Sequence, residues 1–254
     1  TAKATLGSAD NWVIADGGIE PSAFESVWAT TAINETITIP CQNVGTFNAV
    51  VDWGDGTANS TITAYNDADL AHVYATAGDH TISITGTFPN IYFANTGDKL
   101  KIKKVLNLGT VGWTAFNNAF KGCSNLTEFT AGSTDTSGVG ITFQMFGSCG
   151  LTTADLSSFD TSSVSNMSYM FYNSGGLTSI VGVEDFIITG LNSTGDLTGF
   201  LSNGRMTTAQ YDNLLVNWEA QSEFAGMSPT FGASTYTGGS AAATARAAML
   251  SPGR

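Results

Sequence analysis

Phenylalanines and leucines recur along the second half of this chain at nearly constant spacing. The phenylalanines are Phe120, Phe146, Phe171 and Phe200, spaced 26, 25 and 29 residues apart. The leucines are Leu126, Leu151 and Leu177, spaced 25 and 26 residues apart. A period of roughly 20 to 50 residues is typical of a solenoid, in which each unit buries its apolar side against the next. We therefore expect about four stacked coils over residues 98–204.

One stretch shows the repeat most completely: Leu156-Ser-Ser-Phe159-Asp-Thr-Ser-Ser-Val164-Ser-Asn-Met167-Ser-Tyr-Met170-Phe171. With its neighbours it resembles the BspA-type leucine-rich repeat of bacterial surface proteins. The resemblance implies a short leucine-rich-type solenoid, of the kind found in bacterial surface proteins and in phage fibre or decoration proteins. The unit around Leu191 to Phe200 departs from the pattern.

The segment before the repeats alternates apolar and polar residues in short runs. The runs at 37–39, 50–53 and 80–85 predict strands of an antiparallel sandwich. Three blocks occur in order: Trp53-Gly54-Asp55-Gly56-Thr57, His72-Val73-Tyr74 and the run 78–84. They resemble a PKD domain, which implies an immunoglobulin-like β-sandwich over residues 19–97, with its core in 33–87.

Lysines concentrate between these two regions. Residues 99–104 hold four of the six lysines of the chain, and they alternate with Leu100 and Ile102. This pattern favours a solvated edge strand protected by lysine over a ligand site. We expect the segment to mark a junction between two separately packed cores.

After Arg205 the pattern of apolar residues changes from that of the repeats to that of a helix. Tyr211, Leu214, Leu215 and Trp218 have helical spacing behind Thr207, a good N-cap residue. We expect a helical cap over residues 205–254 that closes the solenoid. The predicted fold is therefore mostly β: an immunoglobulin-like sandwich, a leucine-rich-type solenoid and a C-terminal capping helix.

The two ends of the chain have similar sequences. The run Thr244-Ala-Arg246-Ala-Ala-Met-Leu250-Ser matches Thr1-Ala-Lys-Ala-Thr-Leu-Gly-Ser, which continues through Trp12 and Ile14 to an Asp-Gly-Gly sequence. In proteins with this repeat an Ala-rich helix and such a Trp-containing strand commonly close the array, and the resemblance implies the same here. Either residues 1–18 end a preceding unit of a longer head-to-tail array, or they complete the cap of a neighbouring subunit. The third alternative is coincidence.

In a head-to-tail array and in a cap shared between subunits alike, the two ends of the chain would meet. The candidate contacts between units are therefore Trp12, Ile14, Arg246 and Leu250.

Catalytic and metal-binding motifs are scarce. The sequence has no HExxH, GxSxG, P-loop or GxGxxG motif, so we expect no enzyme and no cofactor. The two histidines, His72 and His80, lie in the sandwich region and are better explained by packing than by general-base chemistry. Asp52 and Asp55 are weak calcium candidates, together with an aspartate at 67, 69 or 79, but aspartates that cap tight turns explain the pattern better.

Cys123 and Cys149 occupy the same phase of successive repeats, so stacking could bring them into disulfide range. Unpaired thiols stacked in a turn are an equal alternative, and Cys41 is left alone in both cases.

Three aromatic residues of the repeats, Phe143, Tyr169 and Tyr172, are a candidate binding strip for a sugar or a protein. Residues of this kind are more often part of the core.

The charge of the chain bounds its partners. With 21 acidic and 9 basic residues the net charge is −12, which disfavours a nucleic-acid partner. No stretch of the sequence is long and apolar enough to predict membrane insertion. We expect an extracellular, non-enzymatic structural module of a virion fibre, a decoration protein or a surface filament, whose partners are copies of itself or other surface proteins.

A cell-surface adhesin module that binds a protein or glycan receptor through the solenoid face is the alternative. An accessory domain of a secreted hydrolase is a weaker third hypothesis.

Overall fold

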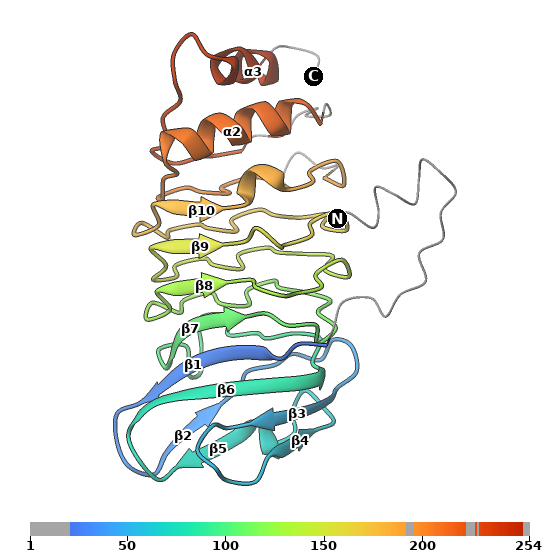
Figure 1. Ribbon diagram of the computed structural model, residues 1–254, viewed down its shortest axis with the longest axis vertical. Coiled ribbons are helices and arrows are strands. Elements are labelled where there is room, and N and C mark those ends of the chain that lie inside the picture. Colours follow the sequence, from blue (N-terminus) through green and yellow to red (C-terminus); the bar gives the residue numbers. More distant parts are fainter. Residues whose placement is uncertain (1–20, 192–195, 222–226, 228, 251–254) are drawn as a thin grey trace, which may run out of the picture.

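The computed structural model describes residues 21–191, 196–221, 227 and 229–250. These residues form an elongated molecule with strands at one end and helices at the other (Figure 1). The strands are β1 (Phe24–Thr30), β2 (Glu35–Thr38), β3 (Asn48–Asp52), β4 (Ser60–Ile62), β5 (Ala71–Tyr74), β6 (Gly78–Thr87), β7 (Ile102–Asn107), β8 (Glu128–Thr130), β9 (Thr153–Asp155) and β10 (Ser179–Val181). The helices are α2 (Thr208–Glu219) and α3 (Ala241–Met249), and single 3-10 turns lie at η1 (Ala68–Leu70) and η2 (Val183–Asp185).

One sheet runs through most of the molecule. Its strand order is β10-β9-β8-β7-β1-β6-β3-β4, and β2 and β5 form a separate antiparallel pair. Pairing is antiparallel from β4 to β7 and parallel from β7 to β10. The expectation of a mostly β chain with a C-terminal helix is confirmed.

Strand β1 joins the antiparallel and parallel parts, and sequence reasoning missed it. Its buried face carries Phe24, Ser26, Trp28 and Thr30, so two polar residues interrupt the apolar alternation. Both find partners: the Trp28 indole N–H donates to Ser26 Oγ at 2.8 Å, and Thr30 Oγ1 lies 2.8 Å from His80 Nε2. A buried hydroxyl with a hydrogen-bond partner is tolerated in a core, which is why the strand forms despite its pattern.

The lysine-rich segment is not an edge strand. Residues 99–101 form a turn, and β7 begins at Ile102 and lies between β1 and β8 inside the sheet. Leu100 is 52% exposed, so it does not share a buried face with Ile102. Lys103 instead pairs with Asp79 of β6, two strands away, at 3.0 Å, and Lys104 pairs with Glu128 of the adjacent strand β8 at 2.8 Å. The prediction of an edge strand is wrong, because β1 covers the side of β7 that was expected to face solvent.

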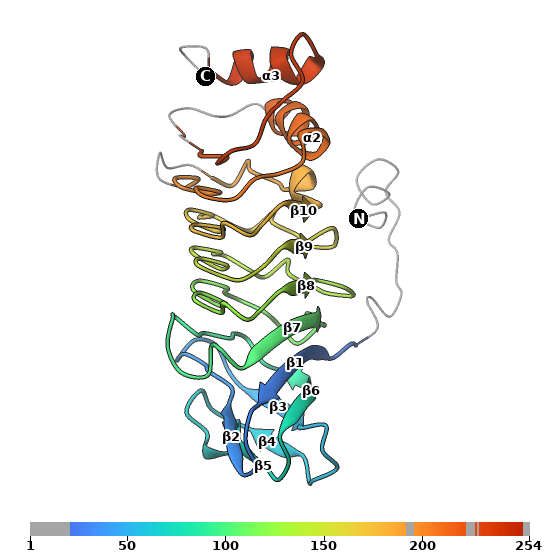
Figure 2. The same ribbon diagram turned by 90° about the vertical axis from the view of Figure 1, so that its left-hand side faces the viewer.

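Beyond β7 the chain forms layers stacked one on another, each with a short strand on one side and a returning segment on the other (Figure 2). Backbone hydrogen bonds join successive returning segments: the N–H groups of Phe93, Phe120 and Phe146 donate to the carbonyls of Ala119, Met145 and Met170 at 2.8 to 3.1 Å. The phenylalanine rings stack in the same column, with centroids 6.3, 5.8 and 5.2 Å apart from Phe93 to Phe171. The first layer therefore begins at Phe93, before the segment where the repeats were expected to start.

The fourth expected layer departs from this column, as its sequence indicates. Phe171 donates its backbone N–H to the carbonyl of Phe200 itself, so the register shifts by one residue. The ring of Phe200 meets Phe171 edge-on at 79°, whereas the rings of Phe120, Phe146 and Phe171 are nearly parallel.

Helix α2 covers the open end of the stack, as its sequence predicts. Thr207 and Gln210 form a capping box at its N-terminus, and Tyr211, Leu214, Leu215 and Trp218 are buried. Gln221, just after the end of this helix, satisfies backbone groups of the last layer: its Nε2 donates to Phe186 O at 2.8 Å, and its Oε1 accepts from the N–H of Ile188 at 2.8 Å. Backbone groups of the last layer are thereby satisfied without another layer.

Cys123 and Cys149 lie in successive layers, as the spacing predicts, but they are free thiols. The Cys149 thiol donates to the carbonyl of Cys123 at 3.3 Å. Burial raises the pKa of Cys149 to about 12 and also raises the pKa of Cys123 and of the third free thiol, Cys41. A disulfide is therefore absent from the structure at this pair.

The buried side chains of the two halves form one cluster. It runs from Phe24 and Trp28 through the phenylalanine column to Trp218 and Ala245. The expectation of two separately packed cores does not hold for the described residues, because β1 packs its apolar face against both halves: Trp28 contacts Phe93, with ring centroids 5.5 Å apart.

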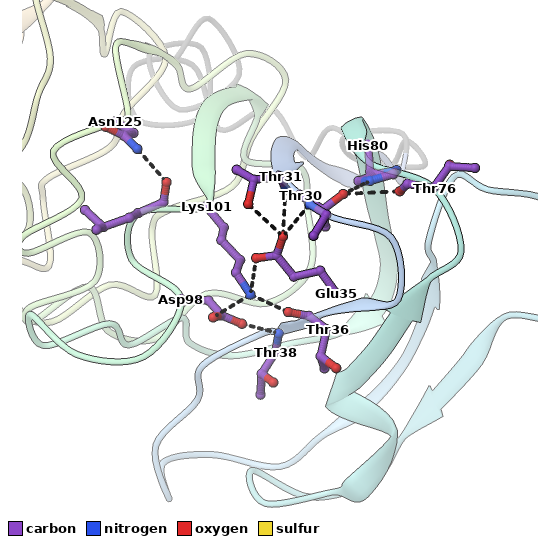
Figure 3. Close-up of polar contacts among 12 residues, drawn as sticks. Thr30, Thr31, Glu35, Thr36, Thr38, Thr76, His80, Asp98, Lys101 and Asn125 are labelled. Atoms are coloured by element: carbon purple, nitrogen blue, oxygen red, sulfur yellow. Dashed lines mark hydrogen bonds and ion pairs between the residues drawn. The ribbon is translucent and has the colours of Figure 1, made fainter.

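A group of charged residues fastens the β2–β5 pair to the turn before β7 (Figure 3). We call Glu35, Asp98 and Lys101 the junction cluster. The Lys101 ammonium lies 3.1 Å from Glu35 and 3.0 Å from Asp98, and it also donates to the carbonyl of Thr36. Asp98 accepts the backbone N–H of Thr38 at 2.7 Å.

Glu35 gives this cluster a pH dependence. Hydrogen bonds from the backbone N–H of Thr31 and from Lys101 lower the pKa of Glu35 from 4.5 to about 2. A carboxyl with a lowered folded-state pKa stabilises the fold above its unfolded pKa and loses this contribution as the pH falls through the folded value. Between pH 4.5 and about 2 the contribution of Glu35 should therefore disappear.

We predict that Glu35→Gln lowers the free energy of unfolding at neutral pH and makes it depend less on pH across that window. Urea denaturation at a series of pH values measures both effects, with Glu25→Gln as the control, since Glu25 lies on β1 and outside the junction cluster. If wild type and Glu35→Gln lose stability in parallel on acidification, Glu35 is not a source of the acid sensitivity.

We also predict that denatured, unreduced protein contains three reactive thiols, whereas the folded protein reacts slowly because its thiols are protonated and two are buried. Titration with a chromogenic disulfide reagent, with and without denaturant, measures the number of reactive thiols. One reactive thiol after unfolding would show that Cys123 and Cys149 are joined.

Candidate functional site

The aspartates considered for calcium use their oxygen atoms in local hydrogen bonds. Asp52 accepts the N–H of Gly54 at 2.9 Å, and Asp55 accepts the N–H and hydroxyl of Thr57 at 3.1 and 2.6 Å. The other Asp55 oxygen lies 2.8 Å from His72 Nε2. Within the described ranges no three His, Cys, Asp or Glu side chains gather so as to hold a metal ion. Turn capping accounts for both aspartates.

The two histidines take part in a column of packed rings. His72 stacks on Trp53 at 4.9 Å and meets Tyr74 edge-on at 4.7 Å. His80 stacks on the other side of Tyr74 at 3.7 Å, and its burial lowers its pKa. Tyr74 in turn donates its hydroxyl to the carbonyl of Trp53 at 2.8 Å. The geometry supports packing as the role of both histidines.

Two of the four candidate contacts between units lie in the described part of the chain. Arg246 lies on α3, with its guanidinium 5.2 Å from the centre of the Tyr236 ring. Leu250 follows α3 and is 66% exposed. Both line a cavity of about 300 Å³ between α2 and α3, together with Tyr211 and Met249. Trp12 and Ile14 lie outside the described residues, as does the whole segment 1–18.

The three aromatic residues predicted as a strip come together on the returning segments of two successive layers. Phe143 meets Tyr169 edge-on at 6.2 Å, and Tyr169 meets Tyr172 edge-on at 5.5 Å. Phe143 and Tyr169 are half-buried, and Tyr172 is 41% exposed. We call these residues the aromatic patch. The alternative that all three belong to the core is wrong, because the core of these layers is filled by Phe146, Met170 and Phe171.

Gly199 of the next layer gives the patch its shape. It has φ of +65°, and a Cβ atom there would lie 2.4 Å from Cδ1 of Tyr169. The ring of Tyr169 therefore lies directly against this backbone, which only glycine permits. Tyr169 itself has φ of +57°, in line with Asn118 at 55° and Gln144 at 52° in the layers before it. The patch is thus held by backbone register and not by a flexible loop.

A row of amide and hydroxyl side chains follows the patch along the stack. Asn173, next to Tyr172 in the chain, donates to Ser148 Oγ at 3.2 Å and accepts from Asn203 Nδ2 at 3.0 Å. Lys121 donates to Gln144 Oε1 at 2.6 Å. Sequence reasoning missed Gly199, Asn173 and Asn203. For Asn173 and Asn203 the signal is a small or amide residue two or three positions after each repeated phenylalanine, and it is visible only once the register of the layers is known.

The four segments that form the patch and the row beside it hold no carboxylate. Residues 117–122, 143–148, 168–173 and 198–203 contain no Asp or Glu, in a chain with a net charge of −12. The hydroxyl groups of Tyr169 and Tyr172 make no hydrogen bond to another described residue. Two aromatic hydroxyls, several amides and a tyrosine ring are therefore available to a ligand at this face.

Comparison with known proteins places one family over the stacked layers. Residues 90–185 match the family described as Mycoplasma protein of unknown function, DUF285. The match covers less than half of the chain and gives no support to the PKD resemblance, whose residues precede it. No curated protein and no solved structure matches the chain. The match begins just before Phe93, where the structure also begins the column of stacked phenylalanines, and ends at the η2 turn that α2 covers.

Proposed function

We propose that this chain is a non-enzymatic structural module of a virion fibre, a decoration protein or a surface filament, exposed outside the cell and joined head-to-tail to further copies. The observation that carries the proposal is the continuous sheet and core, which make one elongated, stiff unit from a two-sheet end to a helical end (Figure 1). A unit of this shape transmits force and spaces its ends, which suits a fibre better than a catalyst.

The finer architecture belongs to the same proposal. The parallel ladder β7 to β10 and the column of phenylalanines support a leucine-rich-type solenoid of the BspA kind. The β2–β5 pair beside the antiparallel strands, with the packed ring column at Trp53, His72 and Tyr74, supports an immunoglobulin-like sandwich of the PKD kind. Strong net negative charge fits a colloidally stable exterior surface.

Joining of units is supported at the helical end. Leu250 is a large apolar side chain that is mostly exposed, and it lines the cavity between α2 and α3 together with Arg246. These residues lie in the run that echoes the beginning of the chain. A partner that brought the segment with Trp12 and Ile14 to this cavity would bury apolar surface on both sides, which stabilises association. No helix among the described residues is long and apolar enough to span a bilayer.

A second candidate function, an adhesin module, is favoured by the aromatic patch. Its aromatic side chains lie on the stacked layers, and none of the three lines the cavity between α2 and α3, so the patch and the proposed joint between units use different residues.

We predict that the purified chain self-associates as its concentration rises at physiological salt, where the repulsion between acidic surfaces is screened. Sedimentation velocity over a concentration series measures this association. Leu250→Asp should abolish it, because a charge would enter the apolar contact. The matched control is Ile33→Asp, since Ile33 is 70% exposed and lies beside β2 at the opposite end of the molecule.

A monomer at every concentration would contradict head-to-tail joining through this end. Association that persists unchanged in Leu250→Asp would contradict the assignment of Arg246 and Leu250 as contacts.

A further inference from the structure

We propose that the aromatic patch, with the amide row beside it, is a binding site for an uncharged oligosaccharide. The inference rests on the second candidate function and names its ligand class. It stands on the exposure of Tyr172, on the amide row at Asn173 and Asn203 and on the absence of carboxylates from this face.

The exposed ring supplies the apolar part of the site. A pyranose carries C–H groups on the faces of its ring and hydroxyl groups at its rim. The face of an aromatic ring is electron-rich and attracts such polarised C–H groups. Tyr172 is 41% exposed, and its edge-on contact with Tyr169 fixes its orientation before any ligand arrives. A ring that is already ordered loses little conformational entropy on binding.

The amide row supplies the polar part. A side-chain amide offers both donors and acceptors, which match the dual character of a sugar hydroxyl. Asn203 and Asn173 are both exposed and already joined at 3.0 Å, so their orientation is set by the stack and their remaining hydrogen-bonding capacity points to solvent. The hydroxyls of Tyr169 and Tyr172, for which no hydrogen bond is found within the described part of the chain, add two more groups of the same kind.

Charge favours a neutral ligand. The four segments that form this face contain no Asp or Glu, and Lys121 is engaged by Gln144 at 2.6 Å. An anionic glycan would have to approach a chain of net charge −12, and the four segments offer it a single cation, the ammonium of Lys121, which already donates to Gln144. A cationic ligand would find no carboxylate there.

Other features of this face disfavour a protein partner. A stable protein interface buries about 800 Å² on each side around several apolar anchors. In the four segments Tyr172 is the one large hydrophobic side chain that is exposed, and its neighbours are Ser, Asn, Gln and Gly. A single ring among amides suits a sugar more than a protein surface.

The test is a titration of the full chain with maltohexaose, cellohexaose and chitohexaose. Isothermal titration calorimetry measures the affinity, and the NMR chemical shifts of the Tyr and Asn side chains report where the sugar binds. At least one of these probes should bind, and Tyr172→Ala should lower its affinity at least about tenfold, the effect of losing one stacked ring. Tyr172→Phe keeps the ring and loses one hydroxyl, so its affinity should fall less than that of Tyr172→Ala. Tyr65→Ala is the matched control, since Tyr65 is 39% exposed on the sandwich, and it should leave the affinity unchanged.

No binding of any probe, or binding that Tyr172→Ala leaves intact, overturns the proposal. So does a glycan array on which only sialylated or sulfated glycans are bound. A protein receptor whose binding requires Tyr172, in the absence of saccharide binding, would leave the adhesin function standing and refute the saccharide. Self-association through Leu250 is measured without sugar, so its outcome is independent of this one.

Discussion

The pairing of β1 with two different strands is the constraint on which the rest of the structure depends. β1 pairs with β6 on one side and with β7 on the other, and so joins an antiparallel sheet to a parallel stack. A stack of layers begins with a strand whose outer edge has no partner, and such an edge invites aggregation. β1 satisfies that edge, with register shifts near Ser26 and Trp28 that accommodate the change of pairing.

The opposite end of the stack is closed by side chains and not by another strand. Gln221 and Trp218 bind backbone groups at Phe186, Ile188 and Val183, and α2 covers the last layer. Between these two closures the phenylalanine column and the interlayer hydrogen bonds repeat with little variation, so the returning segments are held in fixed register. That register is what places Tyr169 against Gly199 and joins Asn173 to Asn203, and so builds the face proposed to bind sugar.

Sequence patterns predicted the elements whose cause is local. Helix α2 follows from Thr207 and its apolar spacing, and the layers follow from the repeated phenylalanines. Strand β1 was not predicted because it buries two polar residues. Ser26 accepts the indole N–H of Trp28, and Thr30 lies against His80, 50 residues later in the chain. The lysine segment was misjudged for a related reason, since β7 pairs with residues 74 to 82 positions earlier in the chain. The aromatic patch was named, but its exposure depends on which residues of adjacent layers face each other.

Thermal unfolding followed by differential scanning calorimetry tests the central claim, that the antiparallel strands at one end and the stacked layers share one sheet and one core. Trp28 is fully buried at their meeting point and contacts Phe93 of the first layer. The account predicts one transition, with equal calorimetric and van't Hoff enthalpies, that Trp28→Ala shifts as a whole to lower temperature. Two separate transitions, or a Trp28→Ala variant in which one half unfolds early while the other keeps its wild-type midpoint, would contradict it.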